Sequence, residues 1–266
     1  LRGLDDADVI GLNALRELGR GYLQQHAGEL ERRSAACRPG DLAILVYTSG
    51  TTGKPKGAMH THGAITYTLR GYNTLIARDE SDEAMCFLPL CHIAERMGGE
   101  YFSLYTGSKL NFVENPDTVP ENVREIAPTV FTAVPRVWEK FYSGVMISLK
   151  ESTRMQQLAY AWAIGVGTCI ADRVLAGEAV SASLKLRFYL ARWLALDNVR
   201  KLIGIHKARF LVTGAAPISP ELVKWYLALG VPMLEVWGMT ETCGAATGVP
   251  ASRMKPGSIG PAAQFN

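Results

Sequence analysis

The sequence of 266 residues has few cysteines, and their spacing matches no framework of disulfides or metal thiolates. The five cysteines stand at positions 37, 86, 91, 169 and 243, with no C-x-x-C pair and no histidine at a ligand spacing. This excludes a small disulfide scaffold and a zinc-type site. We expect free, mostly buried, non-catalytic thiols in a reducing compartment, by default the cytoplasm.

The sequence also lacks a long hydrophobic run. Apolar residues make up 48% of the chain, which is enough for a sizeable buried core in one large domain or two smaller ones. The longest apolar stretch, YAWAIGVGTCIA at 160–171, has twelve residues, too few to cross a bilayer as a helix. We therefore predict a buried helix there.

No strong excess of one charge is present either. The net charge is +3 with 20% charged residues, without the concentrated Lys/Arg face of a nucleic-acid-binding protein. We therefore expect no nucleic-acid partner.

Two nucleotide-binding patterns are missing. There is no G-x-G-x-x-G, and a Walker loop fails because Thr48 stands at the place of its first glycine and Pro55 follows Lys54. This excludes a dinucleotide-binding fingerprint and opposes a phosphate-loop motor or GTPase.

Short β-branched or aromatic runs alternate with helix-like segments along the chain. The expected strands are 41–47, 83–90, 109–114, 129–135, 208–214 and 232–238. One expected helix begins at Ser219 as N-cap with Pro220 in its first turn, and ends at Gly230. The alternation predicts an α/β fold, a mainly parallel sheet with flanking helices.

Two segments depart from this alternation. Residues 1–40 read as a helical lead-in, with an amphipathic helix followed by a polar connector that ends at RPGD. About seventy residues, 136–206, are rich in Ala, Leu and aromatics without a convincing strand, so we predict a helical insertion there.

The stretch YTSGTTGKPKG at 47–57 concentrates the chemistry of phosphate binding. Gly50, Gly53 and Gly57 would let backbone N–H groups turn toward an anion, while Ser/Thr hydroxyls and lysines donate from the sides. A strand before it and a helix after it would place the loop at the carboxyl edge of a sheet, where open α/β sheets bind ligands. A surface turn is the alternative reading of the same composition.

The complete stretch resembles the phosphate loop of the adenylate-forming superfamily, which includes acyl-CoA synthetases, luciferases and peptide-synthetase adenylation domains. The resemblance implies that the loop binds ATP, with Lys56, and less strongly Lys54, as partners for the departing pyrophosphate. The implied nucleotide-binding residues are Thr48, Ser49, Gly50, Thr51, Thr52, Gly53, Lys54 and Gly57.

Two further stretches resemble superfamily signatures. VTGAAPISPEL at 212–222 is similar to the adenine-side loop, which implies that Gly214, Ala215 and Ala216 lie against the nucleotide; an ordinary strand-to-helix turn is the alternative. VWGMTET at 236–242 is similar to the next signature, and contributes Val236, Trp237, Gly238, Thr240 and Glu241. By this resemblance Trp237 stacks on adenine, Thr240 bonds the α-phosphate, and Glu241 coordinates Mg²⁺ together with Thr48. Alone, T-E-T would be a helix cap or a solvated turn.

Two more stretches resemble substrate-side elements. FLPLCHIAER at 87–96 is similar to the element that lines the acyl pocket and thiol tunnel, which implies that His92 is a gate between half-reactions; a structural histidine is the alternative. VPRVWEKFY at 134–142 resembles the equivalent segment of long-chain and bubblegum-type acyl-CoA synthetases, and the insertion after it is typical of them. Trp138 is then either a gate over the fatty-acid tunnel or a core anchor.

The matching residues run from about 41 to 260, so residues 41–266 are expected to form part of the large adenylation domain. The resemblance implies that a ribose-binding Asp, a catalytic Lys and a C-terminal lid domain would follow beyond this sequence. It implies activation of a long-chain fatty acid by ATP, Mg²⁺ and coenzyme A to acyl-adenylate and then acyl-CoA. We expect the isolated fragment to be weak or inactive.

Several alternatives stay open at this point. Another carboxylate-adenylating enzyme, such as an aryl or short-chain CoA ligase or a fatty acyl-AMP ligase, would share these motifs. An amino-acid activator is opposed because FLPLCHIAER contains no Asp to bind an ammonium group. A nucleotide-binding module without catalysis is a second rival. The acyl length, the acceptor, a homodimer and peripheral membrane association also stay open.

Overall fold

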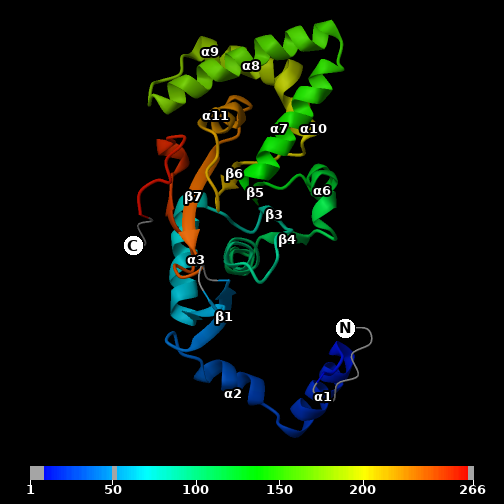
Figure 1. The fold of residues 1–266 in the computed structure, drawn as a ribbon, viewed down its shortest axis with the longest axis vertical. Coiled ribbons are helices and arrows are strands. Elements are labelled where there is room, and N and C mark those ends of the chain that lie inside the picture. Colours follow the sequence, from blue (N-terminus) through cyan, green and yellow to red (C-terminus); the bar gives the residue numbers. More distant parts are fainter. Residues whose placement is uncertain (1–8, 50–52, 263–266) are drawn as a thin grey trace. The chain divides into compact units, whose positions relative to one another are not determined.

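A computed structural model describes residues 9–49 and 53–262 (Figure 1). The chain forms two compact units, Leu1–Asp41 and Leu42–Asn266. In the first unit, α1 (Leu12–Gln25) and α2 (Glu29–Ala36) are separated by Gly28, whose φ of 78° ends helical geometry. The expected single amphipathic helix is therefore two helices.

The second unit contains the sheet and most of the helices. Its strands are β1 (Leu42–Thr48), β2 (Lys56–Thr61), β3 (Glu83–Cys86), β4 (Lys109–Phe112), β5 (Val130–Ala133), β6 (Phe210–Thr213), β7 (Met233–Met239) and β8 (Gly244–Gly248). Its α-helices are α3 (His62–Ile76), α4 (Ile93–Glu95), α5 (Phe102–Thr106), α6 (Val119–Ile126), α7 (Pro135–Lys150), α8 (Arg154–Leu175), α9 (Ala182–Ala191), α10 (Asp197–Leu202) and α11 (Pro220–Ala228). Two π-helical turns, Arg96–Tyr101 and Arg192–Leu196, follow α4 and α9.

The central strands are parallel, as the alternation of elements predicts. Strands β5, β6 and β7 pair in that order and in parallel, β8 pairs antiparallel with β7, and β3 pairs in parallel with β4. The Thr129 N–H donates to the Glu83 carbonyl oxygen at 2.9 Å, which places β3 beside β5. The parallel strands are connected through helices, which confirms the α/β class.

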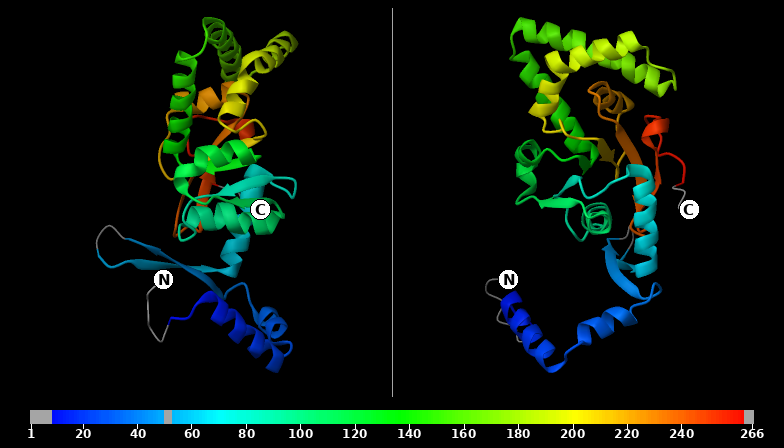
Figure 2. Two further views of the ribbon diagram at one scale, coloured as in Figure 1. Left: turned by 90° about the vertical axis from the view of Figure 1, so that its right-hand side faces the viewer. Right: turned by 180° about the vertical axis from the view of Figure 1, so that it is seen from behind.

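Successive residues of β5, β6 and β7 face opposite sides of the sheet, because side chains alternate along a strand. Phe131, Leu211 and Met233 join one core cluster, with α7, α11 and the helical insertion. Their neighbours join a second cluster with α3 and the π-helical turn after α4, namely Val130, Val212 and Leu234. Helices thus cover both faces of the sheet (Figures 1 and 2).

The segment predicted as an insertion is helical throughout and has no strand between β5 and β6. Its helices have clear start signals: Thr153 forms a capping box with Gln156 at α8, and Ser181 caps α9. At α11, the Ser219 hydroxyl accepts from the Leu222 N–H and Pro220 occupies the first turn, as expected.

Helix α8 differs from the prediction of a short buried helix. It spans 22 residues with a mean hydropathy of 1.3 in its most apolar window, so by length and composition alone it could cross a membrane. Only 17% of that window is buried. The expectation of buried thiols was also wrong in part: Cys86 and Cys243 are buried, whereas the other three are exposed, namely Cys37, Cys91 and Cys169.

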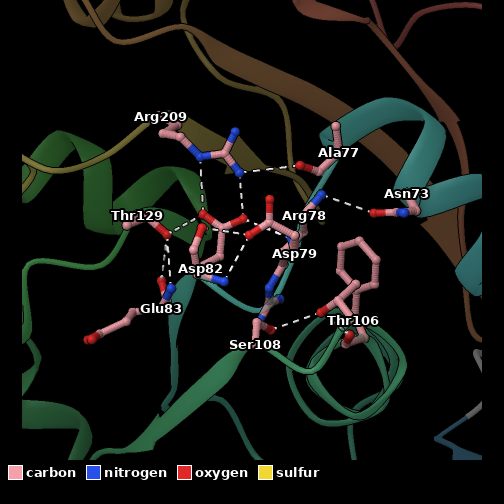
Figure 3. Close-up of polar contacts among 12 residues, drawn as sticks. Asn73, Ala77, Arg78, Asp79, Asp82, Glu83, Thr106, Ser108, Thr129 and Arg209 are labelled. Carbon is pink, nitrogen blue, oxygen red and sulfur yellow. Dashed lines mark hydrogen bonds and ion pairs between the residues drawn. The ribbon is translucent and has the colours of Figure 1, made fainter.

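An ion pair between the buried Asp82 and the exposed Arg209 joins the amino ends of three strands (Figure 3). The Asp82 carboxylate, just before β3, accepts from the Arg209 guanidinium, from the Thr129 hydroxyl at 2.6 Å and from the Asp79 N–H at 3.0 Å. Burial alone would raise the pKa of Asp82, but these hydrogen bonds outweigh it and lower the pKa. The network holds the amino ends of β3, β5 and β6 together. The loops that follow these strands lie at the opposite, carboxyl end.

We expect the Arg209→Ala substitution to lower the free energy of unfolding by about 1–3 kcal/mol at neutral pH, because the buried Asp82 charge loses its cation. The pKa of Asp82 is lowered by folding, so its contribution is complete above about pH 4 and is lost as the pH falls below that value. Urea unfolding from pH 7 to pH 3 should show the difference between the proteins shrinking. Arg124→Ala removes an exposed ion pair with Glu121 and should change stability by less than about 1 kcal/mol.

Candidate active site

Four of the predicted motifs follow the carboxyl ends of neighbouring strands. Residues 87–96 follow β3, 134–138 follow β5, and 214–216 follow β6. Thr240 and Glu241 follow β7 directly. Because the carboxyl ends of parallel strands meet at one edge of a sheet, this edge is the candidate site.

The phosphate loop lies between two antiparallel strands and not between a strand and a helix. Thr48, the last residue of β1, pairs with Lys56, the first residue of β2, and helix α3 starts only at His62. The prediction of a strand-to-helix corner was therefore wrong. The Thr48 hydroxyl donates weakly to the Lys56 carbonyl oxygen at 3.5 Å. Gly50, Thr51 and Thr52 lie outside the described residues.

The described residues of this loop are open to a ligand. Ser49, Lys54, Lys56 and Gly57 are exposed, and so is Gly53. Gly53 has a φ of 126°, which a residue with a side chain rarely adopts. Backbone and lysine donors are therefore available at the hairpin end.

Glycines let β6 and the β7–β8 hairpin approach closely. A Cβ on Gly214 would lie 2.9 Å from the Val236 carbonyl oxygen, and one on Gly238 would lie 2.0 Å from the Gly244 carbonyl oxygen. Ala215, with a φ of 67°, turns the chain immediately after Gly214 and is exposed together with Ala216. The predicted adenine-side residues thus form a small-residue shelf next to Val236.

A tight turn presents Thr240 and Glu241. The Thr242 hydroxyl accepts from the Met239 N–H at 2.9 Å and contacts the Gly244 carbonyl oxygen as donor at 2.7 Å. Cys243 follows in the left-handed region with a φ of 60°. Glu241 is exposed and Thr240 half-buried, so both groups are accessible at the tip of the turn.

The resemblance of this turn to a superfamily signature implies adenylation, and on that basis we expect Thr242→Val to lower its rate by about 10- to 100-fold, because the side chain no longer fixes the turn that carries Thr240 and Glu241. Exchange of pyrophosphate into ATP by the complete protein measures this step. Thr242→Ser keeps the hydroxyl and should retain most of the activity. Equal losses in both variants would contradict this role of the hydroxyl.

Helix α3 joins the hairpin to this turn. The Tyr72 hydroxyl accepts from the Ala245 N–H at 2.7 Å, and burial raises the pKa of Tyr72 to about 12. Figures 1 and 2 show α3 beside β7 and β8. Tyr72 therefore links the helix that follows the phosphate loop to the turn with Glu241.

The base of the hairpin also lies near Glu241. His60 of β2 is only 3% exposed, and its Nε2 atom has no hydrogen-bond partner among the described residues. Burial lowers the pKa of His60, and the Glu241 carboxylate partly opposes this. Thr48 lies four residues along β1 from Ile44, the residue that pairs with His60, which is about 13 Å in an extended strand. No hydrogen bond joins Thr48 to Glu241 among the described residues.

The described residues contain no cluster of three or more His, Cys, Asp or Glu that could hold a metal by itself. An exposed carboxylate and nearby hydroxyls suit Mg²⁺ that arrives with nucleotide phosphates and keeps several waters. Glu241 and Thr240 offer such oxygen ligands. Trp237 is 41% exposed, so one ring face is accessible for stacking.

His92 lies in the loop after β3 and is exposed. Its Nδ1 atom accepts from the Ala94 N–H at 3.1 Å, and this bond caps α4. The Nε2 atom is then available to bind other partners. Such a ring can exchange hydrogen-bond partners, so the gate remains a prediction.

Glu95 holds the loop that leads to His92. Its carboxylate is buried and accepts from the Leu88 N–H at 3.0 Å and the Phe87 N–H at 3.4 Å. Burial raises the pKa of Glu95 in spite of these donors. A Cβ on Gly99 would lie 1.9 Å from this carboxylate, so any larger residue there would displace the Glu95 side chain.

Trp138 is fully buried. Its Nε1–H donates to the Ala133 carbonyl oxygen at 3.1 Å, and its ring packs edge-on against Phe131 and Tyr226 at centroid distances of 5.1 and 5.4 Å. The Tyr226 hydroxyl donates to the Trp138 carbonyl oxygen at 2.9 Å. Of the two roles that the sequence leaves open, this packing favours the core anchor over the gate.

Sequence reasoning missed several residues that shape the site. They are His60, Tyr72, Glu95 and Thr242. A glutamate inside the apolar stretch FLPLCHIAER was a signal for a buried, bonded carboxylate. The others have no sequence signature, because their roles depend on contacts between distant segments.

The glycine shelf and the acidic turn at the sheet edge, with the exposed loop of the β1–β2 hairpin, offer the donors and oxygen ligands that a nucleotide site needs. The AMP-binding enzyme family model matches residues 6–266, and the chain belongs to this family. Fatty-acid-CoA ligase fadD11 of Mycobacterium tuberculosis is 35% identical over 87% of this chain. Long-chain-fatty-acid-CoA ligase ACSBG2 of Gallus gallus is 36% identical over 79% of it. The chain spans 40% and 28% of the length of these relatives.

Solved structures show the same fold. A malonyl-CoA ligase with methylmalonyl-CoA and AMP bound superposes with a TM-score of 0.56 at 22% identity, over 85% of this chain and 39% of that chain. The o-succinylbenzoate CoA synthetase of Bacillus subtilis in complex with ATP and magnesium gives a TM-score of 0.55 at 20% identity, over 85% and 37%. At these identities the likeness establishes the fold alone.

Proposed function

We propose that the complete protein activates a long-chain fatty acid with Mg·ATP to an acyl-adenylate and transfers the acyl group to coenzyme A. The observation that carries the proposal is the position of four motif segments directly after the carboxyl ends of four neighbouring strands, β3, β5, β6 and β7. The named relatives, both fatty-acid CoA ligases, support the substrate class.

The residues present divide the work of adenylation among them. Lys54, Lys56 and the loop N–H groups would bind the β- and γ-phosphates, while Gly214 to Ala216 and Trp237 would hold the adenine. Thr240 would donate to the α-phosphate and Glu241 would hold Mg²⁺, while Thr48, farther along the hairpin, would bind the phosphates together with the rest of the loop. When bound, this ion offsets the negative charge that opposes attack of a carboxylate on phosphorus.

The same assignment gives His92 the role of a gate between adenylation and thiol attack. Glu95 would keep the loop before His92 in place by binding two backbone N–H groups. A cytoplasmic location and a homodimer are further parts of the proposal.

The experiment is an assay of the complete protein with acids from medium to very long chain length. We expect fatty-acid-dependent exchange of pyrophosphate into ATP and formation of acyl-CoA, highest with long chains. Aryl or short-chain acids as the preferred substrates would indicate another CoA ligase. Acyl-adenylate without acyl-CoA would indicate a fatty acyl-AMP ligase, and neither product a binding module without catalysis.

A further inference from the structure

The outer face of α9 is apolar and exposed although the helix also packs inward. This outer face consists of Leu186, Tyr189 and Leu190 of α9 and of Trp193 in the π-helical turn that follows it, with Tyr189 and Trp193 each 70% exposed. At 100° per residue the three positions of α9 fall within an arc of about 100°. Phe188 and Ala191, on the opposite side, pack into the core. The outer face thus has no partner among the described residues.

Cations border this apolar face on both sides. Lys185 and Arg187 lie about 100° to either side of Leu186, and the structure gives neither an acidic partner in the part it describes. Helix α9 has no acidic residue. The insertion, 136–206, has 10 Lys/Arg and 5 Asp/Glu, whereas the rest of the chain has 18 and 20. The positive charge is therefore concentrated in the insertion.

The neighbouring α8 is also apolar outside, but it is fixed to the domain. A Cβ on Gly167 would lie 2.1 Å from the Ala228 carbonyl oxygen, and the Trp225 Nε1–H donates to the Tyr160 hydroxyl at 2.9 Å. These contacts hold α8 against α11, with α9 beside it at one end of the unit (Figures 1 and 2). These contacts with α11 would have to break before α8 could span a membrane.

We propose that the outer face of α9 docks on the surface of an anionic lipid bilayer. Trp and Tyr favour the region of the head groups, leucines enter the acyl boundary, and lysine and arginine extend toward anionic head groups. A second copy of the chain fits less well, because an isologous contact would bring the same cations together. The inference depends on this surface and not on the proposed reaction. If that reaction holds, docking would bring the enzyme to the phase in which long-chain acids dissolve.

The test is sedimentation of the complete protein, without ATP, with vesicles of phosphatidylcholine alone or with phosphatidylglycerol added. We expect binding to the anionic vesicles only. Tyr189→Ser with Trp193→Ser, and separately Lys185→Glu with Arg187→Glu, should each weaken it at least about 10-fold. The matched control is Leu104→Ser, which alters a leucine of α5 that is 75% exposed, and it should bind as the parent does.

Equal binding to both vesicle types, equal binding by all variants, or no binding by the complete protein would overturn the inference. Light scattering and the emission of Trp193, compared with a Trp193→Phe variant, would then show whether a second copy or another part of the chain covers the face. Acyl-CoA synthesis from a water-soluble acid is measured in parallel. Synthesis without vesicle binding would contradict this inference and leave the proposed function standing. Vesicle binding without synthesis would contradict the proposed function and leave this inference standing.

Discussion

The Glu241→Gln variant of the complete protein is expected to exchange pyrophosphate into ATP about 10²- to 10³-fold more slowly than the parent. The substitution keeps the shape of the side chain at the tip of the β7–β8 turn and removes its charge. Glu241 is exposed, so the fold should keep its stability within about 0.5 kcal/mol. The loss then reports on Mg·ATP and not on folding.

A second readout of this variant does not involve catalysis. Glu241 acts against the effect of burial on the pKa of His60, so removal of its charge should lower that pKa further. Titration of the His60 ring by NMR checks this proximity. Glu125→Gln, which changes an exposed glutamate on α6, should leave both the exchange rate and His60 unchanged. Unchanged exchange in Glu241→Gln would favour a binding module with a vestigial loop.

The sequence predicted the central strands well, because their runs of β-branched and aromatic residues signal burial on both faces of a sheet. It missed β2, KGAMHT, and β8, GAATG, which are rich in Gly and Ala. These strands exist because β1 and β7 offer them a backbone partner, and propensity alone does not show this. The missed β2 is the reason why the phosphate loop was placed before a helix.

Burial of helices was harder to predict than their position. The composition of α8 indicates a core helix, yet it packs only in part, against α7, α9 and α11, and just 17% of its most apolar window is buried. The spacing of apolar residues along a helix shows that one face is apolar, but it does not show whether that face packs in the core or lies on the surface. The same limit applies to the site: motifs located Glu241 and Gly214, whereas Tyr72 became visible only through its contact with Ala245, far along the chain.

The Trp138→Ala substitution should lower the free energy of unfolding by about 3–5 kcal/mol, since it empties a fully buried site and removes the donor to Ala133. Trp138→Phe should cost less, because a phenyl ring keeps part of the contact with Phe131 and Tyr226. Trp162→Ala is the matched control: this tryptophan of α8 is 44% exposed, and its loss should cost less than about 1 kcal/mol.

Chemical unfolding of the three variants, combined with acyl-length profiles, decides between the two roles of Trp138. If Trp138 is a core anchor, its replacement lowers stability, and the protein that remains folded keeps the same preferred acyl length. A gate does the opposite, because a removed lid admits longer or bulkier acids while the fold persists. If Trp138→Ala is as stable as Trp162→Ala and prefers a different acyl length, Trp138 is a gate. A tunnel for the acyl chain would then lie on this side of β5.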